Sequence, residues 1–108
     1  MTDGLDGILF QEIERWWDAN RASLAAGGTV AVLQGPFEAV GMDPVYIVRL
    51  DSGHREAEAH LFRGGILLLY SLGRNEPVGV ENDAVDITSA GELTETLDRF
   101  AWPPWPTA

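Results

Sequence analysis

The residue types best suited to chemistry gather on residues 54–62, where two histidines alternate with acids. His54, Glu56, Glu58 and His60 occupy every second position. Imidazole exchanges protons near neutral pH and, with carboxylates, binds metals. On a strand, same-face neighbours are about 6.6 Å apart, which separates the histidines by about 20 Å. Glu58 and His60 could ligate a metal only if other strands supplied more ligands. We therefore predict no metal site, and a polar strand face turned to solvent or to a partner.

Other catalytic patterns lack a necessary residue. His54-Arg55-Glu56 matches the His-x-Glu of zinc deaminases, but their metal also needs a Pro-Cys-x-x-Cys, and this chain has no cysteine. No serine lies in a Gly-x-Ser-x-Gly turn, and no lysine exists for a phosphate-binding loop. Nothing places a carboxylate pair at glycosidase spacing in a cleft, so we interpret three pairs as solvated charges: Glu12 with Glu14, Glu56 with Glu58, and Asp83 with Asp86. We predict that the protein is not an enzyme and uses no cofactor.

Net charge bears on the choice of partner. The 108 residues include 17 acidic and 7 basic ones, a formal net charge of -10. A field of this sign repels phosphate backbones and anionic lipids and speeds encounter with a basic protein. The alternative is that the acidic residues only keep the protein soluble. We predict a protein partner with a basic surface, and no binding to nucleic acid or membrane.

Targeting signals are lacking in the sequence. The longest apolar run, residues 66–70, falls far short of the roughly 18 residues that span a bilayer. The first residues are acidic where a secretory signal would be basic. The absence of cysteine is compatible with a reducing compartment. We expect a cytoplasmic location.

Helical spacing marks the first element, residues 5–26, which ends at Gly27-Gly28. Its apolar positions include Trp16 or Trp17. These neighbours lie about 100° apart around the axis, so both cannot face the middle of one buried surface. We therefore expect one tryptophan at the rim, and take Trp17 as a partner-binding candidate. The alternative is that it packs as a flank under a loop.

A period of two then predicts strands. Residues 29–34, 45–50, 54–62 and 66–71 read as strands, with a short strand at 78–80 and an edge strand at 84–88. Gly35-Pro36 is expected to break the first strand, making 37–44 a loop, and Gly64-Gly65 to form a tight hairpin. We expect Glu56, Glu58 and His60, with Arg49 beside them, on the open face of this antiparallel sheet.

The closing helix is announced by a capping box at Ser89 and Glu92, followed by Leu93, Leu97 and Phe100 on one helical face. It is expected to end before Trp102. The order of elements predicts one α+β domain over residues 1–108, a two-layer sandwich in which an antiparallel sheet of about 4–6 strands is covered on one face by an N-terminal and a C-terminal helix.

Residues 102–108 form a Trp/Pro-rich tail. Trp102 and Trp105 are three residues apart, which puts both rings on one side of a polyproline II helix. They could clamp the protein's own core, grip a partner or a second copy, or stay mobile. We add both to Trp17 and the polar strand as candidate partner-binding residues.

Four features occur along residues 8–100. These are a tryptophan-bearing first helix (Glu14-Arg-Trp-Trp-Asp18), a Gly-Thr-Val strand start at Gly28, a middle block of strands, and a Thr88-Ser-Ala-Gly-Glu-Leu93 start to the closing helix. In this combination the chain resembles the immunity proteins of bacterial polymorphic toxin systems, most closely the TriTu-type family. The resemblance implies neutralisation of a cognate toxin by tight non-covalent binding. Contact residues do not carry over, and neither the tail nor the acidic strand has a match in it.

Two other functions remain open from the sequence. A secretion chaperone or adaptor would bind an extended client segment, usually as a dimer. A small-molecule pocket would have Tyr46, Tyr70 and the histidines as its polar groups. For an immunity protein we expect a monomer or weak homodimer when no toxin is bound.

Overall fold

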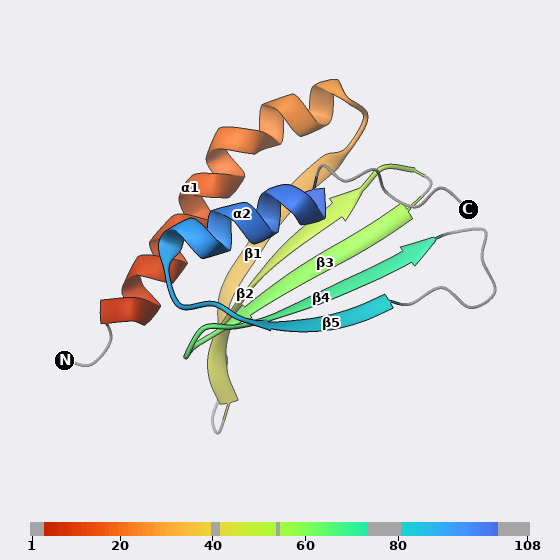
Figure 1. Cartoon of the computed structure of the whole chain (residues 1–108). Helices are drawn as coiled ribbons and strands as arrows, with labels where there is room; N and C mark the ends of the chain where they lie inside the picture. Colours follow the sequence, from red (N-terminus) through yellow and green to blue (C-terminus); the bar gives the residue numbers. More distant parts are fainter. Residues whose placement is uncertain (1–3, 40–41, 54, 74–80, 102–108) are drawn as a thin grey trace.

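The chain forms two layers, a five-stranded antiparallel sheet and two helices on one side of it (Figure 1). The computed structural model describes residues 4–39, 42–53, 55–73 and 81–101. The elements follow in the order α1 (Gly4–Ala26), β1 (Val30–Ala39), β2 (Met42–Asp51), β3 (Arg55–Phe62), β4 (Ile66–Gly73), β5 (Glu81–Asp86) and α2 (Ala90–Ala101). Each strand pairs with the next, giving the order β1-β2-β3-β4-β5. The predicted α+β sandwich is confirmed.

The core lies between the two layers. Within α1 its members recur at three- or four-residue intervals over most of the helix, so one stripe faces the sheet. In β2 and β3 they alternate, so the intervening side chains point away from the helices. The buried cluster consists of Leu9, Ile13, Trp16 and Leu24 of α1; Tyr46, Val48 and Leu50 of β2; Ala57, Ala59 and Leu61 of β3; Leu67 of β4; Ile87; and Leu93, Leu97 and Ala101 of α2.

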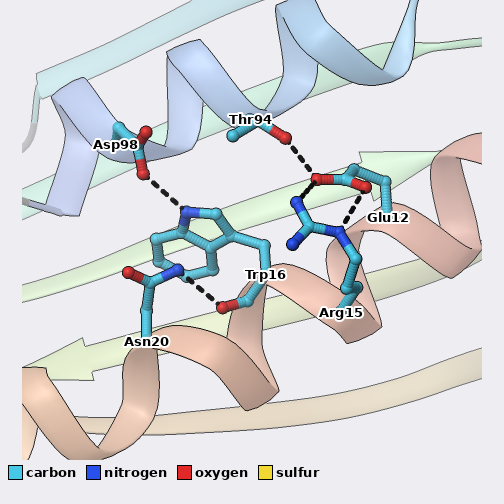
Figure 2. Close-up of polar contacts among 6 residues, drawn as sticks. All are labelled: Glu12, Arg15, Trp16, Asn20, Thr94 and Asp98. Atoms are coloured by element: carbon cyan, nitrogen blue, oxygen red, sulfur yellow. Dashed lines mark hydrogen bonds and ion pairs between the residues drawn. The ribbon is translucent and has the colours of Figure 1, made fainter.

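Polar contacts join the two helices (Figure 2). The indole Nε1 of Trp16 donates to the carboxylate of Asp98 at 2.9 Å, across the seam between α1 and α2. Glu12 accepts from Arg15 Nε at 2.8 Å and from the hydroxyl of Thr94 on α2. The Arg15 hydrogen bond, more than that of Thr94, holds the pKa of Glu12 below its usual value. These contacts fix α2 beside α1.

The start of α2 uses the predicted capping residues with one change of partner. Ser89 Oγ accepts from the backbone N–H of Glu92 at 3.1 Å. The Glu92 carboxylate reaches back to Thr88, whose N–H and hydroxyl donate to it at 2.6 and 3.0 Å. The return bond of a capping box would go to the N–H of Ser89 itself. The backbone hydrogen bond from Thr88 is the main cause that lowers the pKa of Glu92.

The predicted loop at 37–44 is wrong. β1 continues to Ala39 and β2 begins at Met42. The Gly35-Pro36 peptide is cis, and the ladder shifts register between Gln34 and Phe37 instead of ending. Among the described strands β1 has β2 as its one neighbour, and such an edge strand tolerates a proline, which has no N–H to donate.

The remaining strand predictions have mixed outcomes. The predicted edge strand at 84–88 is found as β5, shifted to Glu81–Asp86. The short strand at 78–80 and His54 lie outside the described residues. The hairpin at Gly64-Gly65 is confirmed, with both residues at positive φ. Over the described part of the chain, no helix is long and apolar enough to cross a membrane.

Candidate protein-binding site

The sheet has a second face, turned away from both helices, which we call the open face. Along β2 the side chains of Tyr46 and Val48 enter the core, so Ile47 and Arg49 point to the opposite side. Residues paired across antiparallel strands share a face, which extends the open face from strand to strand. Its rows, read from the pairing, are Phe37, Val45, Phe62 and Ile66; Gln34, Ile47, His60, Leu68 and Ala84; Val32, Arg49, Glu58 and Tyr70; and Val30, Asp51 and Glu56.

One end of the open face is apolar. Phe37, Val45, Phe62 and Ile66 form what we call the apolar row, which crosses β1 to β4. Strand pairing joins the first three, and Ile66 shares their face because its neighbour Leu67 points into the core. Phe37 and Ile66 expose 49% and 46% of their surface, Phe62 is half-buried and Val45 is buried. Single exposed apolar residues are common, but a contiguous group rimmed by polar residues is typical of a binding surface.

The other end is charged. Arg49, Glu56, Glu58 and His60 form what we call the charged cluster. Glu58 lies at its centre, with Arg49 Nε at 3.1 Å and His60 Nε2 at 2.8 Å from its carboxylate oxygens. The second contact of Arg49, to Glu56, is longer at 3.8 Å. Because Arg49 is about half exposed, solvent screens these ion pairs. They add little to the stability of the fold and mainly fix the positions of the side chains.

Aromatic contacts hold His60 in place between the two ends. Its ring meets the ring of Tyr70 in an edge-on arrangement with centroids 4.9 Å apart, and the ring of Phe62 at 6.4 Å. His60 thus joins the charged cluster to the apolar row. The two parts form one continuous surface with a graded polarity.

The structure brings together only some of the predicted site residues. Glu56, Glu58 and His60 share the open face with Arg49 beside them, as expected. Arg49 contacts both carboxylates of this strand. Trp102 and Trp105 lie outside the described residues.

Trp17 lies apart from the open face. Its indole Nε1 donates to the backbone oxygen of Ala31 on β1 at 3.0 Å, and the guanidinium of Arg21 lies 4.8 Å above its ring. The side chain is half-buried against the core, on the helix side. The tryptophan at the rim is therefore Trp17, as one of the two had to be, and it packs as a flank against β1.

Sequence reasoning missed the apolar row. Phe37 was assigned to a loop, so no strand alternation was applied to it. Phe62 continues the series Glu56, Glu58, His60 by two more residues, and that spacing was sufficient to place it on the same face. Ile66 belongs to a strand with apolar residues on both faces, so alternation could not assign it to the open face. Strand pairing was needed to bring the three together.

The other candidate chemistries do not assemble in the described part of the chain. Residues 4–39, 42–53, 55–73 and 81–101 hold no cluster of three or more His, Cys, Asp or Glu that could bind a metal ion. Tyr46 lies on the core side of β2 and Tyr70 on the open face, so they do not line one pocket. Burial, followed by a hydrogen bond to Glu14, raises the pKa of Tyr46 to about 12.

Comparison with known proteins leaves the open face as the main guide to function. No protein-family model matches the chain, and no curated protein or solved structure gives a significant match.

Proposed function

We propose that this protein is an immunity protein that neutralises a cognate bacterial toxin by tight, non-covalent binding of a basic toxin domain. The observation that carries the proposal is the open face, where exposed apolar side chains adjoin a charged cluster on a surface free of both helices. Protein interfaces combine an apolar centre with a polar rim in this way.

Charge supports a basic partner. The chain has ten more acidic than basic residues. Among the described side chains of the open face, four are acidic and Arg49 is the one basic side chain; the acidic ones are Asp51, Glu56, Glu58 and Asp86. Toxins that cleave nucleic acid need basic grooves to bind phosphates, and an acidic surface both attracts and competes for such a groove.

The proposed setting is the bacterial cytoplasm, where a toxin from the same or a neighbouring cell would act. The free protein is a monomer or weak homodimer in this proposal, because its net charge opposes close self-association. Inhibition requires occupancy of the toxin and no catalysis.

The test is co-purification from the native cell, with the product of the gene immediately upstream included. The expected result is a one-to-one complex with the C-terminal domain of a larger protein, which is toxic when expressed alone and harmless when co-expressed with this chain. A stable homodimer that binds unfolded client segments but no folded toxin would instead identify a secretion chaperone.

A further inference from the structure

The open face is apolar at one end and charged at the other, and this arrangement indicates which side chains a partner would place against it. The inference rests on the proposed function. The apolar row crosses four strands, and the members of the charged cluster lie one to three rows away, or roughly 7–20 Å along the strands. Both ends fit within the area of an ordinary protein interface. A single partner surface can therefore cover them together.

The apolar row is the part with most to gain from contact. Phe37 and Ile66 each leave nearly half of their surface in water, and burial of apolar area is the main favourable term in association. Glu58 differs, because Arg49 and His60 already contact its carboxylate. A basic residue of the partner would therefore share the Glu58 carboxylate with Arg49 and His60.

Acidic groups flank the apolar row on two sides. Asp86 of β5 is exposed and pairs with Ile66 in the sheet, so it continues the row beyond its last apolar member. Glu58 lies two rows toward the opposite end of the face. A partner seated on the row therefore meets a carboxylate on each side.

We propose that the apolar row is the anchor of the complex, and that the toxin domain docks on it with a protruding apolar or aromatic side chain flanked by basic residues, one near Asp86 and one near Glu58. The charged cluster orients the partner and the apolar row holds it. A second copy of this chain is a poorer occupant, because it would bring its own acids and a net charge of -10 to the same place.

The experiment measures binding of the intact chain to the toxin domain found by co-purification, in a catalytically inactive form, by calorimetry at several salt concentrations. The anchor is tested with Phe37→Ser combined with Ile66→Thr. A matched control is Ile8→Thr, since Ile8 is 51% exposed but lies on α1.

We expect the double variant to weaken binding at least a hundredfold with an unchanged salt dependence, and the Ile8→Thr control to stay within about threefold of the wild type. Asp86→Asn with Glu58→Gln should weaken binding about tenfold at low salt and reduce the salt dependence. Far-ultraviolet circular dichroism and thermal melting of each variant separate lost contact from lost fold.

Three results would overturn the inference. If the folded double variant binds the toxin domain like the wild type, the apolar row is not the anchor, while the proposed function stands. If the acid variants leave the salt dependence unchanged, the flanking cations are absent. If the wild type forms a dimer that the double variant abolishes, the row is an interface between copies. Failure of every toxin candidate to bind the wild type would remove the proposed function itself.

Discussion

Gly65 joins two parts of the sheet by a close backbone approach. Its φ is 92°, a region that favours glycine, and its carbonyl oxygen accepts from the N–H of Ile87 at 2.7 Å. A β-carbon at this position would collide with the backbone oxygen of Ile87. Its neighbour Gly64 has nearly the same φ, 93°, but open space where a β-carbon would stand. A side chain at Gly64 would therefore meet only the strain of a positive φ, whereas a side chain at Gly65 would meet the same strain and a collision with Ile87.

Gly64→Ala is expected to lower the free energy of unfolding by about 1 kcal/mol, the cost of a positive φ for a side chain. Gly65→Ala is expected to cost about 3 kcal/mol or more, because the backbone must also move. Urea unfolding of the two variants measures the difference. Equal losses would mean that the approach of Gly65 to Ile87 is relaxed in solution.

Tyr46 gives a second prediction at the residue scale. Its pKa is raised to about 12, mainly by burial, so the folded protein retains the phenolic proton that the unfolded chain loses near pH 10. This stability is fully present below pH 10 and is lost as the pH rises toward 12. Tyr46→Phe should therefore show a shallower loss of stability than the wild type in denaturant titrations between pH 9 and 12. Parallel curves would exclude Tyr46 as the cause.

At the scale of the elements, the two helices and their seam are where sequence and structure agree best. Helical period and capping residues are local signals, so both helices were placed within one residue of the observed start or end at most boundaries. The contacts of Glu12 with Thr94 and of Trp16 with Asp98 link residues 82 positions apart, and no local pattern encodes them. The strand from Phe37 to Ala39 was missed because Gly35-Pro36 imitates a turn, and only pairing with β2 reveals it.

The seam predicts a dependence on acid pH. The pKa of Glu12 is lowered in the folded state, chiefly by Arg15, so its stabilising effect is present above about pH 4.5 and is lost as the pH falls through the folded value. Glu12→Gln is expected to cost roughly 1–2 kcal/mol at pH 7 and much less at pH 3. Urea unfolding at both pH values tests this, with Thr94→Ala as a comparison that removes the weaker of the two influences on the pKa and should reduce the pH dependence less. A cost independent of pH would contradict it.

The whole molecule combines a strong net charge with a sheet face that both helices leave open. Composition alone predicts the net charge, and the alternation along residues 54–62 predicts the polar strand face. Together they were sufficient to expect a binding surface that contains Glu58 and His60. The apolar row was not readable, because its members come from four strands and meet only through register. The prediction that one of the two tryptophans lies at the rim is confirmed by Trp17, yet its indole hydrogen bond to Ala31 depends on the tertiary fit of α1 against β1.

Long-range charge predicts the kinetics of the proposed complex. Raising the salt concentration from about 50 to about 300 mM should slow association by roughly tenfold and change dissociation less than about twofold, because screening acts on encounter more than on the docked contact. Stopped-flow mixing with the toxin domain gives both rates. A salt effect confined to dissociation would contradict charge-driven encounter.

The hydrogen bond from Trp17 to Ala31 also bears on aggregation. An outer strand such as β1 offers its backbone groups to any extended chain, which is how foreign strands add to sheets and how fibrils grow. In β1 the indole already occupies the carbonyl of Ala31, and Pro36 has no N–H to give. A visiting strand would therefore find at least one backbone acceptor of this outer edge already occupied. The Trp17 indole thus makes β1 a poorer template for an added chain.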